Sequence, residues 1–128
     1  MLTQMSIRNF ALIEQMNISF KDGITIFTGE TGAGKSILMD AFSILLGERA
    51  SSEFIRHGKD SFVIDGIFDI ANHQSLLDLL QSKNILVEDN QLILSRSFNT
   101  SGKSIILAND QPIPLKALKE IRSEEHTS

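Results

Sequence analysis

The chain has 128 residues, 41% of them hydrophobic and 22% charged, which is typical of one globular domain. Twelve basic and sixteen acidic residues give a formal net charge of −4, so non-specific binding of nucleic acid by this segment alone is disfavoured. Cysteine is absent, which excludes disulfide scaffolds and thiolate zinc sites. No apolar run approaches the ~20 residues of a membrane-spanning helix, and no contact with a membrane is expected.

The first half of the chain predicts strands followed by a helix. Apolar and polar residues alternate loosely over residues 2–10 and 12–20, as on half-buried strands. A Lys-Asp-Gly turn then leads to a short strand at 24–28, rich in β-branched and aromatic residues. After a glycine-rich loop, residues 36–46 predict a helix that is apolar nearly all round. We expect this helix to be buried on most sides and to end at Gly47.

The second half of the chain predicts short elements joined by polar turns. In chain order these are a polar loop at 51–60, a strand at 61–70, an amphipathic helix at 74–81, two strands at 91–98 and 104–108 joined as a hairpin, and a helix at 115–121. Arg56 and Arg96 are isolated arginines, and a surface position is expected for both.

One segment carries a chemical signature. Residues 29–36 match the phosphate-binding pattern G-x-x-x-x-G-K-[ST] at every fixed position, and they lie between a predicted strand and a predicted helix. Glycines let the backbone approach a phosphate closely, and successive N–H groups form an anion-binding nest. The residues expected to bind a nucleotide are Gly29, Glu30, Thr31, Gly32, Ala33, Gly34, Lys35 and Ser36.

Two side chains of this loop have distinct expected roles. Lys35 would supply a positive charge to the β- and γ-phosphates, and Ser36 would present its hydroxyl to Mg²⁺. The helix that follows adds unpaired N–H groups and the positive end of its dipole. The pattern therefore predicts a site for a nucleotide with Mg²⁺.

Two other segments resemble parts of a nucleotide site but are interpreted as structural. Gly102-Lys103-Ser104 repeats the end of the motif, yet Ser97 stands where the first glycine should be and a β-like segment follows. We expect a hairpin tip there. Asp65 follows a short apolar run, as a magnesium-binding aspartate can, but alternation favours a solvent-facing residue on an amphipathic strand.

With the loop identified, the first 121 residues resemble the N-terminal head segment of RecN-type bacterial DNA repair proteins. These proteins are relatives of the SMC proteins among the ABC-type ATPases. Beside the phosphate-binding loop, the segments that carry the resemblance are Ile7-Arg-Asn-Phe-Ala-Leu-Ile13, Asp40-Ala-Phe-Ser-Ile-Leu-Leu-Gly-Glu-Arg-Ala50, Ile55-Arg-His-Gly58 and residues 92–115.

This resemblance implies a fold and a function. The fold would be an α/β P-loop NTPase, the truncated first lobe of an ABC/SMC-type head with an antiparallel β-subdomain. The function would be that of the ATP-binding part of a RecN-like ATPase acting in DNA double-strand-break repair and recombination. Arg8 and Asn9, in the opening segment, become further candidates for nucleotide contact.

The resemblance also implies cofactors and partners. ATP and Mg²⁺ would bind at the loop, with Ser36 as the metal-facing residue. The expected partners are the C-terminal half of the same head, DNA through the full-length protein, and a second head in a head-to-head dimer, in the cytoplasm and on the nucleoid. The signature motif, Gln loop, catalytic carboxylates and switch histidine of such heads are not recognised in the chain. No catalytic residue is therefore assigned, and the chain alone is expected to be inactive.

Two alternatives stay open at this point. The chain could be another P-loop NTPase, a small kinase or a GTPase, although no GTPase elements and no arginine-rich lid are recognised. It could also be an inert nucleotide-binding fragment. Residues 122–128 resemble a translated sequencing adapter, so the expected domain covers residues 1–121 and the remainder is expected to be a non-native tail.

Overall fold

The computed structural model describes residues 1–20 and 32–126. The predicted strand at 24–28 and three motif residues, Gly29, Glu30 and Thr31, lie outside the described residues. The elements in chain order are β1 (Leu2–Phe10), β2 (Ile13–Ser19), α1 (Gly32–Leu45), the 3₁₀ turn η1 (Ser52–Phe54), β3 (Ser61–Asp69), α2 (Gln74–Ser82), β4 (Gln91–Asn99), β5 (Ser104–Ala108), β6 (Gln111–Pro112) and α3 (Leu115–His126).

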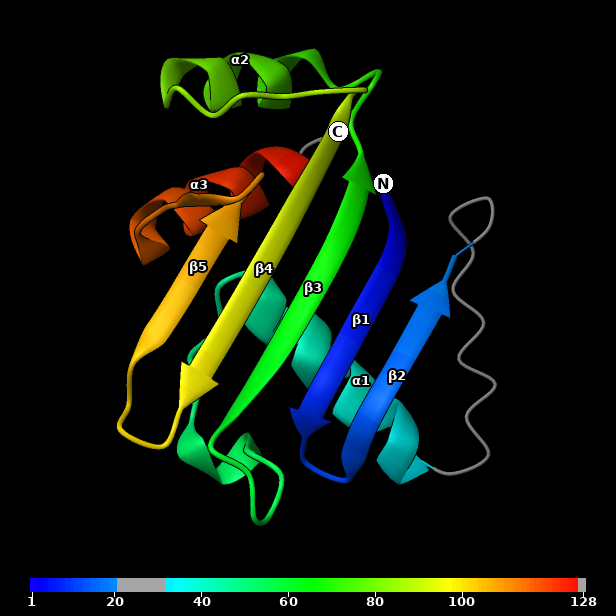
Figure 1. Cartoon of the computed structure of the whole chain (residues 1–128). Helices are drawn as coiled ribbons and strands as arrows, with labels where there is room; N and C mark the ends of the chain where they lie inside the picture. Colours follow the sequence, from blue (N-terminus) through cyan, green and yellow to red (C-terminus); the bar gives the residue numbers. More distant parts are fainter. Residues whose placement is uncertain (21–31, 127–128) are drawn as a thin grey trace.

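The described strands form one sheet in the order β2-β1-β3-β4-β5-β6, and every neighbouring pair is antiparallel (Figure 1). Strands β3, β4 and β5 pair in sequence order, which confirms the predicted hairpin. The pairing of β1 with β3 instead joins segments separated in the chain by β2 and α1. This long-range pairing places α1 across one face of the sheet, as Figure 1 shows.

The sheet has an inner face that packs against the helices. Alternate side chains of β1, β3, β4 and β5 point to this face and are almost fully buried. The buried inner-face residues include Met5, Ile7, Phe62, Ile64, Phe68, Leu92, Leu94 and Ala108. They pack with buried residues of the helices, namely Ala41, Ile44 and Leu45 of α1, Leu76 and Leu80 of α2, and Leu118 and Ile121 of α3. Because successive side chains of a strand point to opposite faces, every second strand residue contributes to the core.

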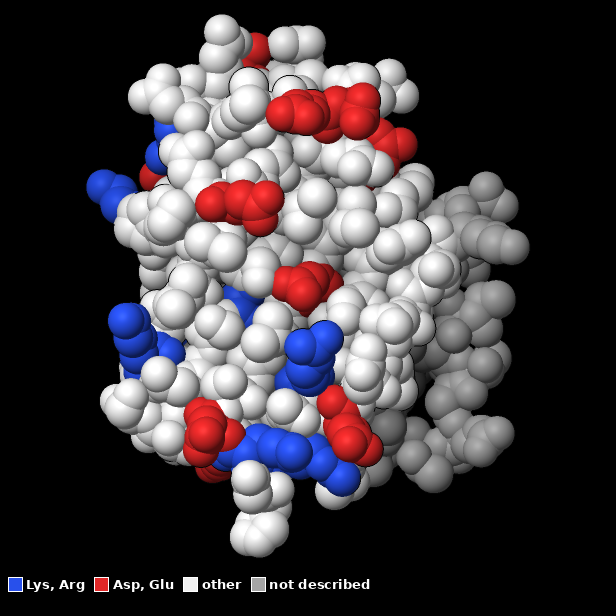
Figure 2. Space-filling model, in the orientation of Figure 1, with Lys and Arg blue, Asp and Glu red and all other residues white. Residues whose placement is uncertain are grey.

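The outer face of the sheet carries the intervening residues. It mixes polar side chains, such as those of Ser6, Arg8 and Ser95, with half-exposed apolar ones. None of the described helices covers this face, which is turned toward the viewer in Figures 1 and 2. The sheet therefore has one face buried and one face open, as antiparallel sheets commonly do.

Helix α1 ends at Leu45, and Gly47 stops it two residues later, as predicted. The backbone of Gly47 adopts φ 112°, a left-handed conformation that glycine tolerates. The Gly47 N–H donates to the Ile44 carbonyl at 3.1 Å, and the Glu48 N–H donates to the Ser43 carbonyl at 3.0 Å. This pair of bonds is a Schellman motif, which satisfies carbonyls that the helix end would otherwise leave open.

The expectation that this helix is buried on most sides is correct only for its second half. Ala41, Ile44 and Leu45 are buried against the sheet, whereas Met39 is 45% exposed and Asp40 is also exposed. The reason is that the described elements pack against α1 from the side of the sheet alone. The described residues therefore leave Met39 and Asp40 of α1 exposed.

The C-terminal helix is longer than predicted. The sequence pattern predicts residues 115–121, and α3 runs over Leu115–His126 because the polar residues that follow Ile121 continue the helical turns. The short strand β6 was not predicted at all. The division into a domain at 1–121 and a non-native tail at 122–128 stays a prediction. Among the described residues, no helix combines the length and apolar character needed to cross a bilayer.

Gly66 on β3 allows α1 to approach the sheet closely. A Cβ atom added at Gly66 would lie 2.6 Å from Cδ2 of Leu45 and 3.3 Å from Cδ1 of Leu2. Leu45 is fully buried, so its side chain has little room to move away. We predict that Gly66→Ala lowers the free energy of unfolding by about 1–3 kcal/mol, measured by urea denaturation.

The control for this prediction is a double-mutant cycle with Leu45→Val, which removes the outer part of the crowded side chain. The double variant should be more stable than the sum of the two single effects predicts. Strictly additive effects, or a Gly66→Ala variant as stable as the original chain, would show that this contact does not hold α1 in place.

Candidate phosphate-binding site and its anchor

The phosphate-binding motif begins helix α1. Its last five residues, from Gly32 to Ser36, are helical, and no acidic residue lies in the first turn of α1. The N–H groups of a first helical turn have no partner within the helix and carry the positive end of the helix dipole. Ser36 is exposed at this end. The described part of the motif thus presents backbone donors suited to an anion beside an exposed serine.

Arg8 and Asn9 lie at the end of β1 and differ in their placement. Arg8 pairs in register with Gln15 and Val63, and its side chain belongs to the exposed outer face. Helix α1 packs on the opposite face, so the geometry does not bring Arg8 to the first turn of α1. Asn9 is half-buried, with φ 55°, and its carbonyl accepts the N–H of Arg56 at 2.9 Å. Nucleotide contact by either residue stays a prediction.

Arg56 holds the loop after α1 against the turn between β1 and β2. Its Nη1 atom donates to the Leu12 carbonyl at 2.8 Å, and the Ala11 N–H donates to the Phe54 carbonyl. The ring of Phe54 stacks on that of Phe10, with centroids 5.1 Å apart. The surface position expected for Arg56 is only partly correct. Arg56 is half-buried, because its side chain hydrogen-bonds the turn between β1 and β2 from the loop after α1.

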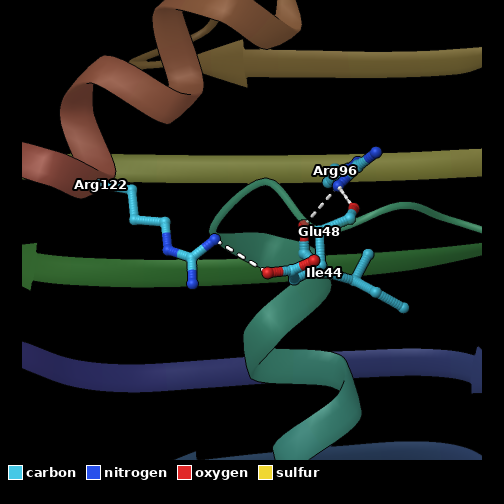
Figure 3. A network of polar contacts seen from close by, with 4 residues as sticks. All are labelled: Ile44, Glu48, Arg96 and Arg122. Atoms are coloured by element: carbon cyan, nitrogen blue, oxygen red, sulfur yellow. Dashed lines mark hydrogen bonds and ion pairs between the residues drawn. The ribbon is translucent and has the colours of Figure 1, made fainter.

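The expected surface position of Arg96 is wrong. Arg96 is only 4% exposed and lies on the inner face of β4, in the same alternating series as Leu92 and Leu94. Its Nη1 atom donates to the Ile44 carbonyl at 2.6 Å and also to the Glu48 carbonyl (Figure 3). Both carbonyls belong to the C-terminal end of α1 and the turn after it. A buried cation is tolerated here because it is hydrogen-bonded by the negative end of a helix.

The surroundings of Arg96 are strongly desolvated. Burial lowers the pKa of the Arg96 guanidinium from its ordinary value. Its Nε atom has no hydrogen-bond partner among the described residues. The energetic role of Arg96 therefore lies in the two carbonyl bonds. A side chain that removed them would leave the Glu48 carbonyl without this donor and the Ile44 carbonyl with only the Gly47 N–H.

A second arginine meets the same turn from outside. Arg122 on α3 donates from Nη1 to Oε1 of Glu48 at 3.0 Å (Figure 3). Both side chains are well exposed, at 38% and 54%, so this ion pair contributes little, on the order of 0–1 kcal/mol. The buried bond from Arg96 is the stronger anchor of the turn.

The second G-K-S sequence forms a hairpin tip, as predicted. Gly102 adopts φ 86° in the turn between β4 and β5, and Ser104 begins β5. The side chain of Asn99 organises the turn, since its Oδ1 accepts the N–H of Ser101 at 3.1 Å and that of Lys103 at 2.9 Å. These backbone donors are already bonded within the turn, which leaves them unavailable to a phosphate.

Asp65 is placed as the structural interpretation predicts. It is half-buried on the outer face of β3, where it pairs in register with Ser6 on β1 and Ser95 on β4. Helix α1 lies on the other face of the sheet. The sheet therefore separates Asp65 from α1 and from the candidate site at its start.

We predict that Arg96→Met lowers the free energy of unfolding by about 1–3 kcal/mol, because it removes the Arg96 donor from the Glu48 carbonyl and one of the two donors from the Ile44 carbonyl. Urea denaturation measures the effect. Arg49→Met is the matched control, since Arg49 lies on the same turn but is exposed, and it should change stability by less than ~0.5 kcal/mol. Equal effects of the two substitutions would contradict the anchoring role of Arg96.

Comparison with known proteins agrees with the predicted resemblance. The RecN proteins of Bacillus subtilis (strain 168) and Vibrio cholerae serotype O1 are 42% and 37% identical to this chain over 121 residues. Both alignments cover 94% of this chain, but only 21% and 22% of the respective relatives. The chain thus spans about a fifth of the length of the curated relatives it matches. Similarity to RecN is confirmed for this segment.

Solved structures confirm the fold. An SMC ATPase from work on ATP-driven dimerization and DNA-stimulated activation has a TM-score of 0.76 at 19% identity, over 99% of this chain and 80% of that chain. The SMC head domain from Thermotoga maritima has a TM-score of 0.70 at 20% identity, over 93% and 41%. The recombination mediator protein RecF has a TM-score of 0.68 at 19% identity, over 94% and 29%. The described residues accordingly form an α/β head lobe with an antiparallel sheet.

The family comparison covers nearly the whole described chain. Residues 4–126 match the family AAA_23, which is described as an AAA domain. The match includes the phosphate-binding motif, helix α1 and every strand from β3 onward. The chain therefore belongs to the AAA_23 family of AAA domains.

Proposed function

We propose that this segment is the ATP-binding part of a RecN-like ATPase that acts in DNA double-strand-break repair and recombination. The observation that carries the proposal is the complete phosphate-binding motif at the start of α1, in a chain similar to RecN proteins. The RecN relatives are named as DNA repair proteins, and the SMC and RecF structures share the fold. The phosphate-binding loop and its helix are the parts of an ATPase that this chain supplies.

The proposed site consists of the whole motif from Gly29 to Ser36. The backbone of the loop and of the first turn of α1 would hold the phosphates, with Lys35 as their counter-charge and Ser36 as the hydroxyl facing Mg²⁺. Two observations fit this assignment: the first turn of α1 has no acidic residue, and Ser36 is exposed. When bound, Mg²⁺ would neutralise phosphate charge, and the protein's own part would be positioning and electrostatic stabilisation.

The partners in the proposal follow from the relatives. The exposed apolar side of α1, with Met39, would be covered by the rest of the head, since the chain spans about a fifth of the relatives. Contact with DNA and head-to-head dimerisation would belong to the full-length protein, as ATP-driven dimerization and DNA stimulation belong to the SMC neighbour. The proposed setting is the cytoplasm, on the nucleoid.

We predict that Lys35→Ala in the full-length protein reduces Mg-ATP affinity by more than about 100-fold, because it removes the charge that faces the β- and γ-phosphates. Isothermal titration calorimetry measures the affinity. Lys103→Ala is the matched control, since Lys103 ends the other G-K-S sequence, at the hairpin tip. Equal ATP affinity in the Lys35→Ala variant and the original protein would overturn the assignment.

Gly34 and Gly102 allow a second comparison of the two G-K-S sequences. We predict that Gly34→Val abolishes ATP binding, because a branched side chain would crowd the bound phosphate. Gly102→Ala should leave ATP binding unchanged, because a Cβ atom there meets open space, although φ 86° adds strain to the turn. Equilibrium binding of a fluorescent ATP analogue tests both. Greater loss of binding in Gly102→Ala would mean that the wrong site has been chosen.

A further inference from the structure

A small pocket on the outer face of the sheet lies far from the proposed phosphate site. It has a volume of about 310 Å³ and lies where β4 begins and the β5–β6 turn passes beside it. This is at the lower end of the volumes of ligand pockets, about 300–1,000 Å³. Its lining includes Leu86, Glu88, Asp89, Ile93, Asn109 and Asp110. We propose that this pocket docks a partner protein through a segment that carries lysine or arginine beside a large apolar side chain.

The pocket offers apolar surface that the described part of the chain does not cover. Leu86, on the connection between α2 and β4, is 70% exposed, and Ile93 on β4 is 40% exposed. Ile93 also pairs in register with the half-exposed Ile67 on β3, which extends the apolar surface onto the sheet. Burying these exposed apolar side chains against an apolar side chain of a partner would favour binding, because it removes apolar surface from water.

The rim of the pocket is acidic. Glu88, Asp89 and Asp110 are all exposed and contribute three negative charges, and the described residues that line the pocket include no basic one. Within the described residues, none of these carboxylates forms an ion pair. Figure 2 shows acidic side chains on the front of the upper part of this face, over the start of β4 and the end of β5. Unpaired like charges around one hollow attract a cationic ligand.

The pocket is preformed by Asn109. Its Oδ1 accepts the Ile93 N–H at 2.7 Å, and its Nδ2 donates to the carbonyls of Leu86 at 2.8 Å and Gln91 at 3.3 Å. The Asn109 side chain, which lies in the β5–β6 turn, thus hydrogen-bonds both the start of β4 and the loop before it. A pocket held in this way costs little reorganisation when a ligand binds, which favours binding.

Charge complementarity decides between classes of partner. Three unpaired carboxylates repel the phosphates of nucleic acid, so DNA is disfavoured at this end of the sheet. A peptide whose apolar side chain fills the hollow, with a neighbouring cation reaching the rim, satisfies both features at once. This inference concerns a surface separate from the phosphate-binding loop, and it does not depend on ATP binding.

The test uses the 128-residue chain and a fluorescein-labelled peptide of alternating lysine and leucine, with binding followed by fluorescence anisotropy. The triple variant Glu88→Gln, Asp89→Asn and Asp110→Asn removes the rim charge. It should keep the backbone geometry, because Asp89 and Asp110 are left-handed, at φ 55° and 67°, and asparagine suits that conformation. The expected result is peptide affinity about tenfold lower, and Leu86→Ser should also weaken binding.

The matched control neutralises three exposed carboxylates at the opposite end of the sheet, with Glu14→Gln, Glu53→Gln and Asp60→Asn. This variant should bind the peptide as the original chain does, and circular dichroism checks that all variants fold. Peptides with glutamate in place of lysine, or serine in place of leucine, should not bind. Equal weakening by the two triple variants, no binding of the lysine–leucine peptide, or binding of labelled duplex DNA that the Glu88, Asp89 and Asp110 triple variant weakens would overturn the proposal.

Discussion

The buried guanidinium of Arg96 is the polar contact that fixes the C-terminal end of α1, the helix that begins with the motif, on the sheet. Its two bonds end on the carbonyls of Ile44 and Glu48, at the C-terminal end of α1. Helix α1 has 14 residues and is thus about 20 Å long, and its first turn, which holds the end of the motif, lies at the opposite end. A rigid helix that is fixed at one end has little freedom at the other. The position of the motif on the sheet therefore depends in part on a contact at the other end of α1.

The inner and outer faces of the sheet have different roles. The inner face packs α1, and the missing side chain at Gly66 lets Leu45 approach the sheet closely. The outer face carries no described helix and presents the acidic pocket at the end of the sheet where β4 begins. The proposed phosphate site on α1 and the proposed docking surface therefore lie on opposite faces of the sheet. This separation also explains why Arg8 and Asp65, both on the outer face, lie apart from α1.

Much of the fold could be predicted because it depends on local patterns. The period of two in β3 and β4, the apolar run of α1 and the glycine at position 47 each determine a nearby feature. The position of Arg96 was missed although a signal was available, since residue 96 continues the inward series of Leu92 and Leu94. Its acceptors could not be predicted, because they lie about 50 residues away on a helix that only the tertiary fold brings near.

The sequence predicts which ligand the candidate site would bind, but not which other residues lie near it. The motif predicts phosphate binding by residues 29–36 because each fixed position has a stereochemical purpose. The residues that lie near the motif in the fold could not be predicted in this way. The pairing of β1 with β3 is non-local, and the left-handed conformation of Asn9 interrupts the alternation of β1, so the faces of its last residues could not be read from the pattern.

The most direct test of the account is hydrogen–deuterium exchange of the 128-residue chain with and without millimolar Mg-ATP. The account predicts slower exchange in peptides that cover residues 29–36, because their N–H groups would bind the phosphates. The hairpin at 99–104 and the pocket at 86–93 should be unaffected. Unchanged exchange at 29–36, or protection confined to the hairpin, would contradict the claim that the start of α1 is the phosphate-binding site.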